Sequence, residues 1–89
     1  MDQSAPPARR LLEEFARREG LRGVDVARAL DVSKALVSQW FSGHLVPGAL
    51  YRLKIERWTG GAVKARDWLT AEERRELAAT RRYRRAEAA

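Results

Sequence analysis

A short polar strip on one predicted helix carries the side chains of this 89-residue sequence that are best suited to specific recognition. Lys34, Ser38 and Ser42 recur at i, i+4 and i+8, with Ala35 and Gln39 beside them. Such side chains read base edges in a DNA major groove: glutamine pairs with adenine, lysine donates to guanine or phosphate, serine suits either, and alanine contacts the thymine methyl group. Any surface helix has a polar face, so whether this strip reads DNA or is only solvated depends on the elements that surround it.

Two short helices that meet at a sharp corner are expected to position this strip. Apolar residues recur at helical spacing on the inward face of both helices, namely Val26, Ala27 and Leu30, then Val37 and Trp40. Ser33 is a good N-cap for the second helix, because its hydroxyl accepts an amide hydrogen there. Gly43 supplies the C-terminal stop. Residues 23–43 are therefore predicted to form a helix-turn-helix, with the recognition helix over 33–43.

This stretch and the residues after it resemble the Cro/YdaS-like helix-turn-helix family of phage and prophage transcriptional regulators, whose DNA-binding domain is lambda-repressor-like. The matching pieces are Ala27 with Leu30, Ser33 through Trp40 followed by Ser42-Gly43, the Val46-Pro47 step, Ile55-Glu56, and Thr59-Gly60-Gly61-Ala62-Val63. Asp31 stands where many relatives have glycine, which is tolerable because aspartate adopts left-handed turn conformations. The segment between Pro47 and Ile55 is slightly longer than is usual in the family.

The resemblance implies an all-α fold, a small bundle of four to five short helices, and a homodimer on a pseudo-palindromic operator. A two-fold partner is physically reasonable, because one short helix reads few base pairs and half-sites lie about 34 Å apart. The residues expected to read base edges are Lys34, Ala35, Ser38 and Gln39. Those expected to contact the DNA backbone are Ser33, Ser42, His44, Arg52 and Lys54.

The charge of the chain favours an anionic partner. The net charge is +6 at pH 7, and the sequence pI is near 10.7. Between Ser33 and Arg66 there are six lysines or arginines and a single acid, Glu56. Double-stranded DNA is the first candidate and an acidic membrane surface the second. Binding through phosphates predicts an affinity that falls steeply as the salt concentration rises.

The composition offers little for catalysis or metal binding. The sequence has no cysteine, and its only histidine, His44, lacks a second histidine for a metal site or a nucleophilic triad. We expect no enzyme, no cofactor and no metal. His44 either contacts a phosphate or base edge, or is a solvated loop residue. No apolar run is long enough to cross a bilayer, so a cytoplasmic protein without a membrane partner is expected.

The chain is expected to divide into three parts. Residues 1–7 form a flexible lead, and residues 8–69 form the helix-turn-helix domain, which ends with a helix over 49–58 and a short element over 62–69. In the helix over 49–58 the apolar residues expected to be buried are Tyr51, Ile55 and Trp58, with Leu50 and Leu53 extending the buried surface. Beyond it, three further apolar residues close the core or form a dimer contact: Val63, Trp68 and Leu69.

A capping box formed by Thr70 and Glu73 opens the third part, residues 70–89. This part carries six arginines and four glutamates among strong helix formers, with few apolar anchors. It is a solvated helix, a basic arm that contacts the DNA backbone, or an element that docks a protein partner.

Two functions of different classes follow. The leading one is sequence-specific DNA binding by a Cro-like transcriptional regulator that acts as a repressor. The alternative is an antitoxin-like module, which binds a protein partner through the C-terminal helix and regulates its own operon by binding DNA.

Overall fold

The computed structural model of the chain describes residues 6–88, and it describes side chains as far as Arg81. Five α-helices and one 3₁₀ helix follow one another: α1 (Pro7–Arg18), α2 (Gly23–Leu30), α3 (Lys34–Ser42), α4 (Ala49–Trp58), η1 (Ala65–Trp68) and α5 (Ala71–Ala88). No strand occurs in the described residues, so the predicted all-α fold is confirmed. The flexible lead predicted over 1–7 falls largely outside the described part, but Pro7 within it is the first residue of α1.

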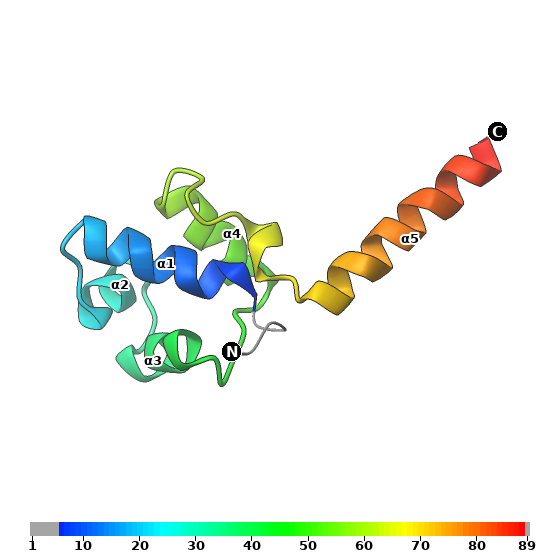
Figure 1. Ribbon diagram of the computed structural model, residues 1–89. Helices are drawn as coiled ribbons and strands as arrows, with labels where there is room; N and C mark the ends of the chain where they lie inside the picture. The colour runs from blue at the N-terminus through cyan, green and yellow to red at the C-terminus, as the bar shows by residue number, and fades with distance from the viewer. Residues whose placement is uncertain (1–5, 89) are drawn as a thin grey trace.

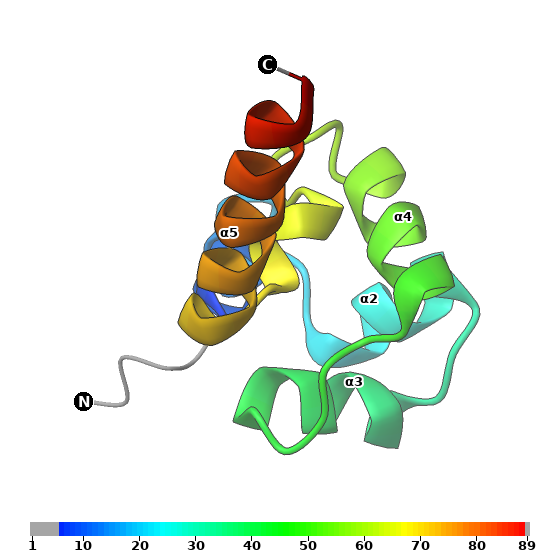
Figure 2. The same ribbon diagram turned by 90° about the vertical axis from the view of Figure 1, so that its right-hand side faces the viewer.

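The first four helices and η1 form a bundle, and α5 leaves it (Figure 1). α2 packs chiefly against α3 and also against α4, while α1 crosses α3 and η1. Figure 2 shows α3 at the opposite edge of the bundle from the top of α4. α5 makes no extensive contact with any other element, and the described chain measures 50 × 28 × 22 Å along its principal axes. No described helix combines the length and the apolar character that crossing a bilayer requires.

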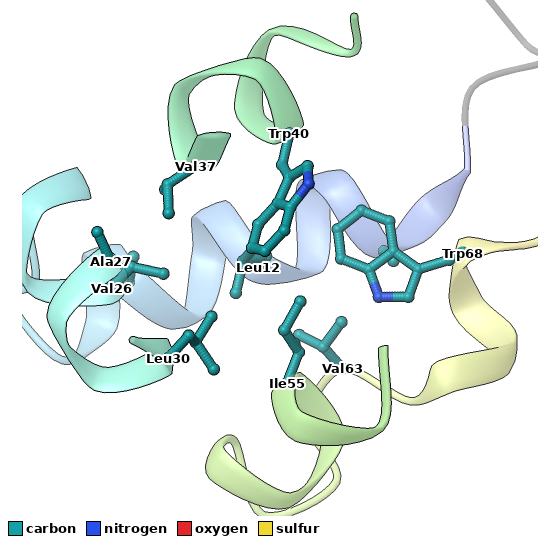
Figure 3. Close-up of a cluster of buried hydrophobic side chains, with 11 residues drawn as sticks. Leu12, Val26, Ala27, Leu30, Val37, Trp40, Ile55, Val63 and Trp68 are labelled. Atoms are coloured by element: carbon teal, nitrogen blue, oxygen red, sulfur yellow. The ribbon is translucent and has the colours of Figure 1, made fainter. Parts of the chain in front are cut away.

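One hydrophobic cluster holds the bundle together (Figure 3). Its members are Ala8, Leu12, Ala16, Val26, Ala27, Leu30, Val37, Trp40, Ile55, Val63 and Trp68. Every element of the bundle contributes at least one of them, so no helix pair is stable without the others. Two aromatic contacts lie at its margins: Trp40 against Tyr51, with ring centroids 5.8 Å apart, and Phe15 edge-on to Trp58 at 5.2 Å. The aromatic side chains therefore pack against the core, as predicted.

All four helices of the bundle end in the same way, at a residue with left-handed backbone. These residues are Gly20 (φ 68°), Asp31 (φ 56°), Gly43 (φ 84°) and Gly60 (φ 63°). In each case the next amide donates back into the last turn: Leu21 N to Ala16 O, Val32 N to Ala27 O, His44 N to Gln39 O, and Gly61 N to Glu56 O, over 2.7–3.0 Å. This is the Schellman arrangement, and it turns the chain sharply between helices. The predicted helix end at Gly43 is confirmed.

Asp31 is the one non-glycine residue with positive φ in the described part of the chain. A left-handed conformation costs an L-residue roughly 1–2 kcal/mol, whereas glycine adopts it freely but loses more chain entropy on folding. Replacing Asp31 by glycine is therefore expected to raise the free energy of unfolding by about 0.5 kcal/mol. Urea denaturation followed by circular dichroism measures this difference. The Asp31→Ala variant, which keeps the strain, should be less stable than the parent; a glycine variant less stable than the parent would contradict the interpretation.

The expectation that Leu50 and Leu53 are buried is wrong. Their side chains are 63% and 54% exposed. Tyr51, Ile55 and Trp58 form one stripe of α4. With about 100° between successive residues, Leu53 falls on the opposite side of the helix and Leu50 on its flank. The core is small and covers only one face of α4.

The predicted capping box at the start of α5 is confirmed. The Thr70 amide donates to Glu73 Oε1 at 2.9 Å, and the Glu73 amide donates to Thr70 Oγ1 at 3.1 Å. The hydrogen bond from the Thr70 amide, followed by that from its hydroxyl, holds the pKa of Glu73 below its ordinary value, and the charge of Arg52 acts in the same direction. The ionised carboxylate therefore stabilises the first turn of α5.

Because this pKa is lowered in the folded helix, the contribution of Glu73 is present above the carboxyl's unfolded pKa and is lost as the pH falls through the folded value. We expect the helical circular dichroism signal to decline in acid. The Glu73→Gln variant, which keeps a capping side chain without a charge, should decline less. Identical acid titrations of the two proteins would show that this carboxylate has no such role.

Candidate nucleic-acid interface

The rotation of α3 is fixed by its N-cap and by two buried side chains. The Leu36 amide donates to Ser33 Oγ at 3.1 Å, which starts the helix as predicted. Val37 is fully buried and Trp40 is 2% exposed, so this side of α3 faces the core. The opposite side must then face solvent. The helix thus presents a defined surface.

The structure places all four predicted base-reading residues on that outer surface. The side chains of Lys34, Ala35, Ser38 and Gln39 are exposed. They come from the first two turns of a helix of nine residues, about 13 Å long, at the edge of the bundle (Figure 1). A major groove is about 12 Å wide and admits an α-helix. The geometry suits contact by the N-terminal part of α3.

Ser42 and His44 lie together at the other end of α3. Ser42 Oγ is 2.7 Å from His44 Nδ1 and 3.1 Å from the Gln39 carbonyl oxygen. When the single hydroxyl proton is donated to the carbonyl, protonated Nδ1 is the donor to the serine oxygen. Both side chains are exposed. The serine therefore fixes the histidine ring beside the C-terminal turn. An exposed ring that is held by Ser42 is compatible with both interpretations of His44, the DNA contact and the solvated loop residue.

Arg9 is a candidate contact residue that the sequence did not reveal. A Cβ atom built on Gly43 would lie 3.0 Å from Arg9 Nη1, so the guanidinium rests over the end of α3. Its Nε is 4.0 Å from Glu13 Oε1. Glycine is favoured at position 43 by its positive φ, while the flexible end of Arg9 could shift to admit a Cβ atom. Only the crossing of α1 over α3 brings Arg9 here, and no local pattern in α1 indicates that crossing.

The two predicted backbone-contact residues of α4 point to different places. Arg52 is half-buried and donates from Nε to the Pro47 carbonyl at 2.7 Å, so it secures the loop between α3 and α4. Lys54 is exposed, with Nζ 5.3 Å from the centroid of the Tyr51 ring. It lines a shallow groove with Asp31 and Arg57, between the end of α2 and α4. The structure does not gather Arg52 and Lys54 into one site.

The N-terminus of α2 supplies another exposed cation. Arg22 donates from its backbone amide to Asp25 Oδ2 at 2.8 Å and from Nε to the same oxygen at 3.4 Å. The backbone hydrogen bond is the main reason why the pKa of Asp25 lies below its ordinary value. In helix-turn-helix proteins the helix before the recognition helix crosses the DNA backbone. Arg22, with its side chain 80% exposed, is suitably placed on such a helix.

Four exposed apolar side chains follow directly after α3. They are Leu45 (47% exposed), Val46 (43%), Leu50 (63%) and Leu53 (54%), and we refer to them as the apolar segment. Leu45 N donates to the Gln39 carbonyl, so the segment begins against the last turn of α3. Four exposed large apolar residues within nine positions make this segment a candidate contact surface.

Neither a metal site nor a similarity to known proteins indicates a different function. Among the side chains that the structure describes, residues 6–81, no group of three or more histidine or acidic residues is arranged to hold a metal ion. Comparisons with protein-family models, with curated proteins and with solved structures give no significant match. The case for a function therefore rests on the residues and geometry of α3 and its surroundings.

Proposed function

We propose that the protein is a sequence-specific double-stranded DNA-binding regulator of the Cro-like type, acting as a repressor. One observation carries the proposal: the outer face of α3 combines Lys34, Ser38 and Gln39 in a single exposed strip, while the inner face is locked into the core. A rigid helix with side chains matched to base edges meets the main requirement for direct readout. The resemblance of the sequence to Cro/YdaS-like regulators points the same way.

In this proposal each exposed group has a distinct task. Gln39 pairs with adenine, Lys34 donates to guanine, and Ala35 and Ser38 contact the bases between them. Phosphates are contacted around the strip by residues that position the helix without reading sequence: Ser33, Ser42, His44, Arg9 and Arg22, with Lys54 at the corner of the motif.

The partner in DNA binding is a second copy of the chain, which pairs through the apolar segment. Half-sites one helical turn apart require the middle of each α3 to lie about 17 Å from the two-fold axis. Half of α3 measures about 7 Å, and the hydrogen bond from the Leu45 amide to the Gln39 carbonyl holds Leu45 at the end of this helix. The remaining distance to the axis, about 10 Å, falls to the exposed apolar side chains that follow Leu45 along the chain. A symmetric contact there would also cover Leu50 and Leu53.

Replacing Leu50 and Leu53 by glutamine is expected to weaken the dimer and lower operator affinity at least about tenfold, since burying a leucine contributes about 1.5–3 kcal/mol. Glutamine is a good helix former, so α4 should keep its fold. Sedimentation equilibrium and binding titrations at fixed salt measure both effects. The Leu77→Gln variant, on α5, is the control. Unchanged assembly in the α4 double variant would exclude this surface.

The test of DNA reading is selection of duplexes from a random pool with the purified protein, at low and moderate salt. The proposal predicts a two-fold symmetric motif with half-sites about one turn apart. Binding that is tight at low salt, disappears at moderate salt and enriches no motif would reduce the interaction to electrostatic adhesion and overturn the proposal.

A second candidate function is the silencing of a protein partner in the manner of an antitoxin, with DNA binding as autoregulation. The observation that favours it is α5, which projects from the bundle with every described side chain exposed (Figure 1). Removing residues 70–89 should then abolish binding of the partner and spare DNA binding. Loss of DNA binding alone in this truncation would count against it.

A further inference from the structure

A groove of about 360 Å³ separates η1 from α5. Its lining residues are Arg66, Asp67 and Leu69 on the bundle side, and Arg74, Leu77, Ala78 and Arg81 on α5. The four residues of α5 stand at i, i+3, i+4 and i+7, which is one face of the helix. The groove is therefore bounded by a continuous helical stripe on one side and by the end of the bundle on the other.

The lining is both cationic and apolar. Arg66, Arg74 and Arg81 bring three guanidinium groups, against one carboxylate, that of Asp67. That carboxylate already accepts the Lys64 amide at 2.8 Å, where it caps η1. Leu77 is 51% exposed. Water thus covers an aliphatic floor between arginines, an arrangement that a ligand with both acidic and aliphatic groups would stabilise.

The helix that forms this wall has little internal support. α5 is 18 residues long, yet no ion pair occurs among its described side chains and it packs extensively against no other element. A polar helix without packing or i, i+4 ion pairs is marginal in water. A ligand that packs on the Arg74–Arg81 face would supply the contacts that α5 lacks.

We propose that this groove binds an acidic segment of a partner protein, with an aliphatic residue between two carboxylates. Arg74 and Arg81 are seven residues apart, about 10 Å along the helix axis. Carboxylates at that separation stand seven residues apart on one face of a helix. The aliphatic residue rests on Leu77, and the carboxylates form charge-assisted hydrogen bonds to the two arginines. The inference names the chemistry of the partner in the second candidate function and is independent of DNA reading.

A DNA backbone is the less suitable occupant. Phosphates are bound by cations and amides alone, so a DNA backbone in the groove would leave the Leu77 side chain exposed to water. α5 also runs away from the edge of the bundle where α3 lies, so most of its length stands away from DNA held by α3 (Figure 1). An acidic peptide uses both halves of the lining.

The experiment is a display selection of random 16-residue peptides on the immobilised full chain, followed by affinity measurement of the enriched peptides. We expect peptides with two acidic residues seven positions apart and an aliphatic residue midway between them, on the same helical face. Affinity should fall about tenfold or more in Arg74→Ala/Arg81→Ala and several-fold in Leu77→Ala. Arg17→Ala/Arg18→Ala, which removes the same charge from α1, is the control. Alanine preserves helix propensity, and circular dichroism verifies that α5 is retained.

The outcomes separate the alternatives. Absence of an acidic and aliphatic pattern, or equal losses in the α1 and α5 double variants, overturns the proposal in favour of general electrostatic attraction. A loss of duplex DNA affinity in the α5 double variant, without any peptide that depends on these arginines, overturns it in favour of a DNA arm. Operator binding that fails while the peptide result holds would refute DNA reading and leave the groove assignment intact.

Discussion

Replacing both Lys34 and Gln39 by alanine is expected to abolish recognition of the selected operator while leaving the fold intact. A good side-chain contact to a base is worth about 1–3 kcal/mol of discrimination, so two contacts predict a loss of roughly 30-fold or more. Both side chains are exposed on α3 and neither touches the core, and alanine is the best helix former. The loss should therefore appear in specific binding and not in the free energy of unfolding.

The measurement compares affinities for the operator and for an unrelated duplex at one salt concentration. The double variant should lose most of the ratio between the two affinities. Lys64→Ala is the control for lost charge, because Lys64 is also exposed but lies in the turn before η1. If the double variant keeps its preference for the operator, α3 does not read sequence through this face.

Replacing Trp40 by alanine is expected to produce the largest loss of stability of any single substitution in the bundle. Its indole is 2% exposed and stands at the centre of the cluster, facing Leu12 and Trp68 (Figure 3). Loss of a buried tryptophan costs about 3–5 kcal/mol, and a domain of this size has a total stability of roughly 4–13 kcal/mol. A large fraction of the variant should be unfolded near 37 °C, and DNA binding should be lost with the fold.

Thermal and urea denaturation, followed by circular dichroism, measure this loss. Trp58→Ala serves as a comparison, because that side chain is only half-buried at the margin of the core. Its effect should be clearly smaller. A loss below about 1 kcal/mol for Trp40→Ala would show that the cluster does not depend on this residue for its packing.

The ends of the helices could be predicted from the sequence because the residues that start and stop each helix lie close together along the chain. Ser33 caps α3 through its own hydroxyl, Gly43 adopts the left-handed conformation that stops it, and Thr70 with Glu73 opens α5. Each signal involves residues within four positions of one another. The identity of the outer face of α3 followed in the same way, since Val37 and Trp40 determine which side is buried.

Features that depend on how helices cross could not be predicted. Arg9 reaches Gly43 only because α1 crosses α3, and the groove beside α5 exists only because η1 faces that helix. The error over Leu50 and Leu53 has a related cause. Apolar residues on two sides of a helix do not reveal which side the remaining helices will cover, and this bundle is too small to cover both.

The isolation of α5 divides the molecule into two cooperative units. All three tryptophans lie in the bundle and none in α5, so tryptophan fluorescence reports only the melting of the bundle, whereas circular dichroism reports both units. The two signals should have different midpoints on heating. Amides of α5, with few tertiary contacts to protect them, should exchange with solvent long before those of α1 or α3. A bound partner that orders α5 would reduce the difference between the melting midpoints measured by fluorescence and by circular dichroism.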